Sequence, residues 1–151
     1  MPKSIVCDAS CLILFNKIGS LDLLHHVFGK ILITDIIAKE FGYSIPEWIQ
    51  VCPPNSILQK GLINILDAGE ASAITLATEL KDSLLIIDES KGRKIAQKMG
   101  LAVTGSLGIL IIAKRKGHIS SVKAVIERIE RKNFRISPKI IQSVLHKAGE
   151  S

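Results

Sequence analysis

Two short apolar runs, each ending in an aspartate, constrain the fold of this chain more than any other feature. Ile5-Val6-Cys7 leads into Asp8, and Leu84-Leu85-Ile86-Ile87 leads into Asp88. Neither run alternates apolar with polar residues, so both are predicted to be strands buried on both faces, as in a parallel sheet. Open α/β sheets bind ligands at the carboxyl ends of their strands. The sequence therefore predicts that Asp8 and Asp88 lie at one ligand-binding edge.

Segments with helical periodicity separate these runs and two shorter strand candidates. The shorter strands are Ile31–Ile33 and Leu101–Val103. The predicted helices are Cys11–Lys17, Leu21–Phe28, Asp35–Phe41, Gly69–Leu80, Lys91–Met99, Leu107–Lys116, Ser120–Arg131 and one that begins at Ser137, before Pro138. Strand followed by helix, repeated, predicts an α/β fold with a central parallel sheet covered on both faces. Residues 42–61, which contain three prolines, are predicted to be irregular and anchored by Trp48.

The composition predicts a single domain over residues 1–151. Hydrophobic residues make up 47% and charged residues 23%, as in a compact globular protein, and neither a linker nor a repeat divides the chain. The N-terminus does not have the pattern of a secretory signal, and the longest apolar run, Leu107–Ala113, is far shorter than the ~20 residues of a membrane helix. Three cysteines, Cys7, Cys11 and Cys52, are too few for a disulfide framework. We expect a cytoplasmic protein with buried thiols and no membrane association.

The positive charge is concentrated in the last quarter of the chain. Residues 1–110 carry ten Lys and Arg against eleven Asp and Glu, a net charge of −1, whereas residues 111–151 carry ten against three, a net charge of +7. Such asymmetry favours an anionic partner, above all nucleic acid, which proteins bind largely through phosphate contacts. A solvated basic helix face is the plainer interpretation, and the charge alone does not separate the two.

The acidic residues at the predicted sheet edge also allow a purely structural interpretation. Asp8 and Asp88 can cap the helices that follow their strands, and Glu40 can lie on a solvated helix face. Asp67-Ala68-Gly69-Glu70 has the form of a capping box, in which Glu70 reaches back to Asp67. Both interpretations stay open at this point. A phosphate-binding loop is less well supported, because Gly105-Ser106-Leu107-Gly108 lacks a third spaced glycine and a Walker lysine.

Four motifs in a fixed order give the chain a family resemblance. Asp8-Ala9-Ser10 follows the first strand, Glu40 lies in the helix after the second, Gly69-Glu70-Ala71-Ser72-Ala73-Ile74 opens a helix, and Ile86-Ile87-Asp88-Glu89 ends a strand. This order resembles the PIN domain superfamily, in particular a predicted nucleic-acid-binding branch related to the VapC-type toxins. The resemblance covers about residues 4–113 and leaves a basic helical extension, about residues 118–149, outside it.

The resemblance implies a three-layer α/β/α sandwich and a nuclease that hydrolyses RNA phosphodiester bonds with Mg²⁺ or Mn²⁺. By matching position, Asp8, Glu40, Glu70 and Asp88 would be the catalytic and metal-binding acids, and Ser10 the hydroxyl that steadies them. Relatives of this kind also imply a homodimer, a small antitoxin protein as partner, and the toxin role in a toxin–antitoxin pair. From their place just after the Asp88 strand, Arg93 and Lys94 are expected to contact the substrate phosphate.

Two departures from the family pattern keep another class of function in view. The PIN pattern often has Asp where Glu70 stands, and a second acidic residue where this chain has Ser90. A catalytically silent PIN-like module that binds nucleic acid or a partner protein is therefore the alternative to the nuclease. A phosphoryl-transfer domain of receiver or haloacid-dehalogenase type is disfavoured, because the dehalogenase pattern requires Asp at the position of Ser10.

Overall fold

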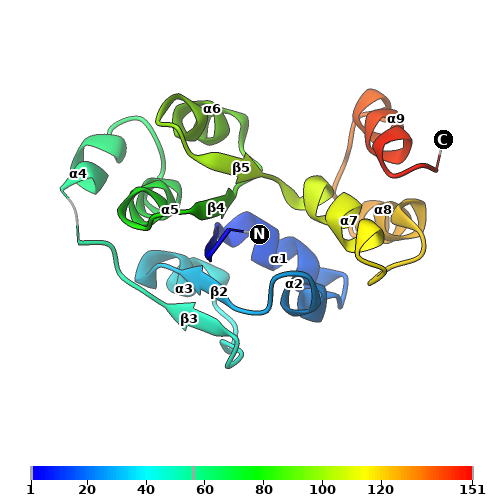
Figure 1. Cartoon of the computed structure of the whole chain (residues 1–151), viewed down its shortest axis with the longest axis horizontal. Coiled ribbons are helices and arrows are strands. Elements are labelled where there is room, and N and C mark those ends of the chain that lie inside the picture. The colour runs from blue at the N-terminus through cyan, green and yellow to red at the C-terminus, as the bar shows by residue number, and fades with distance from the viewer. Residues whose placement is uncertain (1, 56, 151) are drawn as a thin grey trace.

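A five-stranded parallel sheet forms the centre of the protein in the computed structural model, which describes residues 2–55 and 57–150. The strands are β1 (Ser4–Cys7), β2 (Ile31–Ile33), β3 (Ile49–Val51), β4 (Ser83–Ile86) and β5 (Ala102–Thr104). Their order in the sheet is β3-β2-β1-β4-β5 (Figure 1). The chain builds outward from β1 to β3 and then returns to β4 on the other side of β1, so the strand order reverses at β1.

Helices flank this sheet and complete the predicted α/β/α sandwich. They are α1 (Ala9–Lys17), α2 (Leu21–Phe28), α3 (Asp35–Phe41), α4 (Leu58–Leu62), α5 (Ala68–Glu79), α6 (Ser90–Lys98), α7 (Ser106–Arg115), α8 (Val122–Arg131) and α9 (Pro138–Lys147). The predictions for β2, α2 and α3 are confirmed residue for residue, and the other predicted ends lie within two residues of those observed. The Ser137 hydroxyl accepts a hydrogen bond from the Ile140 amide at 3.2 Å and caps α9, as predicted.

The prediction of an irregular segment over residues 42–61 is wrong for two parts of it. Residues Ile49–Val51 form the edge strand β3, and Leu58–Leu62 form the short helix α4. Three residues between prolines are too few to show a period, and in β3 only Ile49 is buried. Trp48 is half-buried and its ring stacks on that of His25 with 5.1 Å between centroids, which agrees with the predicted anchoring role.

Buried side chains from the sheet and from the helices around it make one continuous core. Phe15, Leu12 and Leu24 come from the N-terminal helices, and Cys7 and Cys11 are fully buried among them as free thiols, as predicted. Among the described residues, no single helix is long and apolar enough to cross a membrane; α1 and α2 meet such a criterion only together, as a pair bent by 118°.

The C-terminal helices α7, α8 and α9 lie together at one end of the molecule (Figure 1). The Glu150 carboxylate joins them, because it accepts hydrogen bonds from Lys114 Nζ at 2.9 Å and from the Val122 and Lys123 amides at 2.6 and 3.1 Å. Arg128 of α8 donates to the Ile18 carbonyl at 2.5 Å. The basic extension is thus partly engaged in holding the fold together.

Candidate active site at the carboxyl edge of the sheet

Asp8 directly follows the central strand β1 and is almost fully buried, with 5% of its surface exposed. It occupies the N-cap position of α1, but its side chain makes no capping hydrogen bond to that helix. Burial raises its pKa from 3.8 to about 7, and repulsion from Asp67, Glu40 and Asp88 adds to the rise, which the Ala9 amide offsets only in part. Asp8 therefore occupies the cap position of α1 without the side-chain hydrogen bond that normally caps a helix.

Asp88 lies two residues beyond β4, the strand that pairs with β1, so the two aspartates share one edge as predicted. Its carboxylate accepts hydrogen bonds from the Ser106 amide at 2.7 Å and from the Ser106 hydroxyl at 2.6 Å. Ser106 is the first residue of α7 and is buried, so this pair fixes the direction of the carboxylate. Asp88 thus does have a capping role, toward α7 and not toward the adjacent α6, whose cap is Glu89.

The pKa of Glu70 is raised further than that of Asp8. Glu70 lies in the first turn of α5 with 7% of its surface exposed, and burial together with the neighbouring Asp67 and Asp8 raises its pKa to about 9. Its Oε1 atom is buried without a hydrogen-bond partner among the described residues. Buried polar atoms are nearly always hydrogen-bonded, so this oxygen is one that a bound ion or ligand could satisfy.

Asp67 belongs to the same group of carboxylates although the sequence indicated only a cap. It does cap α5, since its Oδ1 accepts from the Glu70 amide at 2.8 Å. Half of the predicted capping box is therefore confirmed, while the Glu70 side chain turns toward the carboxyls of Asp67 and Glu89. Glu40, near the end of α3, completes the group at its exposed rim; partial desolvation of its carboxyl and repulsion from Asp67 raise its pKa.

Three glycines make room for three of these carboxylates. A Cβ at Gly69 would lie 2.6 Å from Glu40 Oε2, one at Gly92 would lie 2.9 Å from Glu70 Oε1, and one at Gly105 would lie 2.7 Å from Asp88 Oδ1. None of the three glycines has a positive φ. Their role at this edge is therefore to permit close approach, not to adopt an unusual backbone conformation.

The structure brings the four predicted acids, Asp8, Glu40, Glu70 and Asp88, to one edge and adds Asp67 to them. Within residues 2–55 and 57–150, however, no three His, Cys, Asp or Glu side chains already stand in the geometry of a metal site, so the carboxylates would have to turn toward an ion. The predicted basic residues lie beside Asp88: half-buried Arg93 donates to the Ile87 carbonyl at 3.5 Å, and Lys94 is exposed. Ser10 is also exposed, in the first turn of α1.

Comparison with known proteins decides the family. A family model described as a PIN domain matches residues 4–150 of the chain. The chain belongs to the PIN domain family. The match runs well past residue 113, where the resemblance was expected to end, so the PIN domain here includes the C-terminal helices. A search of curated proteins found no match.

The PIN domain family generally includes nucleases that depend on a divalent metal, and the donors at this edge suit such a metal. Carboxylate oxygens are the hard ligands that Mg²⁺ and Mn²⁺ prefer. Burial is the main cause of the raised pKa values of Asp8 and Glu70, and a cation would relieve the repulsion from neighbouring acids that adds to it. The orphaned Oε1 of Glu70 is one oxygen that such an ion would satisfy.

Sequence reasoning missed two residues of this PIN domain site. Asp67 was assigned only a capping role, although a cap at the start of α5 lies at the same edge as Glu70. Ser106 lies in a glycine-rich stretch whose pattern indicates no contact with Asp88. Its position just after a predicted strand indicates the carboxyl edge of the sheet, but only the pairing of β5 with β4 brings its amide and hydroxyl to Asp88.

Proposed function

We propose that this protein is a metal-dependent ribonuclease that hydrolyses RNA phosphodiester bonds with Mg²⁺ or Mn²⁺. The observation that carries the proposal is the group of five carboxylates at the reversal point of the sheet, where repulsion and burial raise the pKa values of Asp8 and Glu70 to about 7 and about 9. Like charges are gathered in this way where a cation compensates them. Membership of the PIN domain family supports the same class of reaction.

Asp8, Glu40, Glu70 and Asp88 would hold the ion through their oxygens, with Asp67 next to them. A bound divalent ion in such a site supplies a water of lowered pKa and neutralises charge on the phosphate oxygens. The protein keeps Asp88 in place through Ser106, and Ser10 is proposed to steady the acids from α1. Arg93 and Lys94 line the cavity at Asp88 and would bind the phosphate of the substrate.

The raised pKa values make proton release a direct consequence of ion binding. At neutral pH the carboxyl group of Glu70, whose pKa is about 9, holds a proton, and Asp8, whose pKa is about 7, is protonated about half of the time. A carboxylate must be deprotonated to ligate a metal. Binding of Mn²⁺ at pH 7 is therefore expected to release protons, and the heat of binding to depend on the ionisation heat of the buffer.

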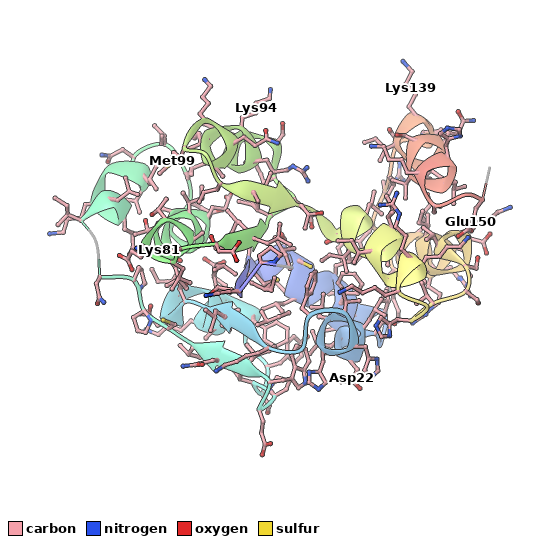
Figure 2. The ribbon with its side chains drawn as sticks, viewed as in Figure 1. Asp22, Lys81, Lys94, Met99, Lys139 and Glu150 are labelled. Atoms are coloured by element: carbon pink, nitrogen blue, oxygen red, sulfur yellow. The ribbon has the colours of Figure 1, made fainter. Side chains whose placement is uncertain are left out.

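The test of the proposed function is RNA cleavage in the presence of Mg²⁺ or Mn²⁺. The wild-type protein is expected to cleave a mixed-sequence RNA, whereas Asp8→Asn and Asp88→Asn are expected to lose most of this activity. Asp22→Asn, in α2 far from the sheet edge, is the control for a purely electrostatic change (Figure 2). Cleavage that survives both site substitutions would refute the assignment.

A catalytically silent PIN domain that binds nucleic acid is the second candidate. It is favoured by the absence, within the described part of the chain, of three side chains in metal-ligand geometry, and by Ser90 at the family's second acidic position. Calorimetric titration with Mn²⁺ separates the two. RNA retention without any Mn²⁺ binding would support the silent module, whereas binding that Asp8→Asn abolishes would support the nuclease.

We also propose that the protein is the toxin of a toxin–antitoxin pair, acts as a homodimer and is held by a small antitoxin protein. The support is the sequence resemblance to VapC-type toxins and the large apolar side chains exposed around α4, such as Ile57, Ile63 and Ile65. Light scattering of the purified chain tests the dimer. Growth arrest on expression, absent in the Asp88→Asn variant, tests the toxin role.

A further inference from the structure

Two cavities lie at the carboxyl end of β4. One cavity of about 410 Å³ lies between the end of β5, α7 and α9, and Gly108, Ile140 and Lys147 are among the residues that line it. A second cavity of about 380 Å³ lies against α6. Asp88 and Arg93 line both cavities, so the two lie on either side of these residues at the candidate site. We call the first of them the α7–α9 groove.

The walls of the α7–α9 groove combine an apolar surface with positive charge. Leu107 and Ile111 of α7 face Ile140 and Val144 of α9 across it. Ile140, in the first turn of α9, is half exposed, at 50%. Arg93 stands at the Asp88 end of the groove, and Lys147, in the last turn of α9, adds a second cation to its lining.

This chemistry matches one nucleotide of a single strand. A nucleobase offers apolar faces, and the phosphates on either side of it carry negative charge. The volume lies within the range of small-molecule sites and is too small for a folded partner.

We propose that the α7–α9 groove is a nucleotide subsite, in which an unstacked base lies against Ile111, Ile140 and Val144 while Arg93 and Lys147 bind the adjoining phosphates. The proposal rests on the proposed function, because it places that nucleotide next to the bond to be cleaved. It assigns substrate binding to α9. The subsite would favour single-stranded RNA over a duplex, because the bases of a duplex are stacked inside and cannot reach an apolar wall.

Within the basic extension, α9 and not α8 then recruits the RNA. Arg128 of α8 already donates to the Ile18 carbonyl and to the Ser20 hydroxyl, so it is engaged within the fold. Lys147 lines the groove with its side chain, whereas its backbone carbonyl accepts from Arg115 at 3.5 Å. Charge reversal at Lys147 is therefore expected to reduce RNA affinity more than charge reversal at Arg131 or Lys132.

Methyl NMR of the full chain tests the subsite without relying on catalysis. Uridine 5′-monophosphate and adenosine 5′-monophosphate are titrated in Mg²⁺ buffer into protein labelled at Ile and Val methyl groups. The methyl signals of Ile111, Ile140 and Val144 are expected to shift together along one binding curve, while those of Ile57 and Ile63 near α4 stay in place. Shifts confined to other regions, or no shift with either nucleotide, would overturn the proposal even if the protein cleaves RNA.

Matched charge changes on one helix provide the second arm. Lys147→Glu is expected to weaken binding of a fluorescent single-stranded oligonucleotide about tenfold, because it removes a charge-assisted contact. Lys139→Glu, with the same change in net charge but outside the groove lining, is expected to change the affinity little. Equal losses in the two variants, or equal affinity of the wild type for a duplex of the same sequence, would contradict a built subsite. If the wild-type protein shows the expected methyl shifts but does not cleave RNA, the result would count against the proposed nuclease and not against the subsite.

Discussion

Replacing Asp8 with asparagine is expected to stabilise the metal-free protein. Asp8 is 95% buried, and burial and acidic neighbours raise its pKa from 3.8 to about 7. At pH 8 its ionisation therefore costs the folded state about 4 kcal/mol relative to the unfolded chain. An asparagine amide in the same place avoids that cost but loses about 1–3 kcal/mol through imperfect hydrogen bonding. The net expectation is a gain of about 2 kcal/mol, or about 4–8 °C in melting temperature.

The pH dependence distinguishes this cause from a change in packing. Below about pH 4 the Asp8 carboxyl is neutral in both the folded and the unfolded state, so it costs nothing there. Because its folded-state pKa is raised, the wild-type protein loses stability as the pH rises from about 4 to about 7, and the loss levels off above that. Asp8→Asn is thus expected to be the less stable protein near pH 4 and the more stable one at pH 8.

Thermal melts in EDTA from pH 4 to pH 9 measure this difference. Asp22→Asn, at the surface of α2, is expected to change the free energy of unfolding by less than about 0.5 kcal/mol at every pH. Addition of Mg²⁺ is expected to stabilise the wild type and not the Asp8 variant. A difference between wild type and Asp8→Asn that does not vary with pH would refute the reasoning.

Three further substitutions probe the site and its support. Gly69→Ala inserts a methyl group against the flexible end of Glu40, so the Mn²⁺ affinity measured by calorimetry is expected to fall. The free energy of unfolding in urea is expected to stay the same or to rise by about 0.5–1 kcal/mol. Gly61→Ala, in open space on α4, is the control. Ser106→Ala removes the hydroxyl that donates to Asp88 and is expected to weaken Mn²⁺ binding about tenfold, with Ser143→Ala as the exposed control; unchanged affinity would mean that the amide alone holds Asp88. Glu150→Gln is expected to cost about 1–2 kcal/mol in urea denaturation. Hydrogen bonds from Lys114, Val122 and Lys123 hold the Glu150 pKa at about 2. The loss of stability in Glu150→Gln should therefore be present above about pH 4.5 and fade as the pH falls toward 2. Glu127→Gln on α8 is the control and is expected to show no such dependence on pH.

The sequence predicted the elements whose residues follow a clear period or a clear run. The sequence predicts β1 and β4 because buried parallel strands are apolar throughout. It predicts α2 and α3 because polar residues alternate with apolar ones at helical spacing. β3 and α4 were not readable. Each is too short to show periodicity, and β3 belongs to the sheet through backbone hydrogen bonds such as Ile31 to Trp48 and Cys52 to Ile33.

At the site, the sequence predicted which acids gather but not how each is held. Position after a strand was enough to place Asp8 and Asp88 at one edge. The link between Asp88 and Ser106 depends on β5 lying next to β4, a pairing that motif spacing does not reveal. The orphaned oxygen of Glu70 and the cavity between α7 and α9 depend on side-chain packing, which a pattern of residue types does not determine.

The pairing of β1 with β4 has a consequence for how the chain folds as it is synthesised. Lys3 hydrogen-bonds to Asp82, 79 residues further along, so the second edge of the central strand stays open until that segment has been made. At about 5–20 residues per second this takes several seconds, during which β1 can pair only with β2. Parallel pairings of this separation are slow to form. Until β4 joins, the acids on the two halves of the sheet remain apart, so a partly synthesised chain is expected to have no assembled site.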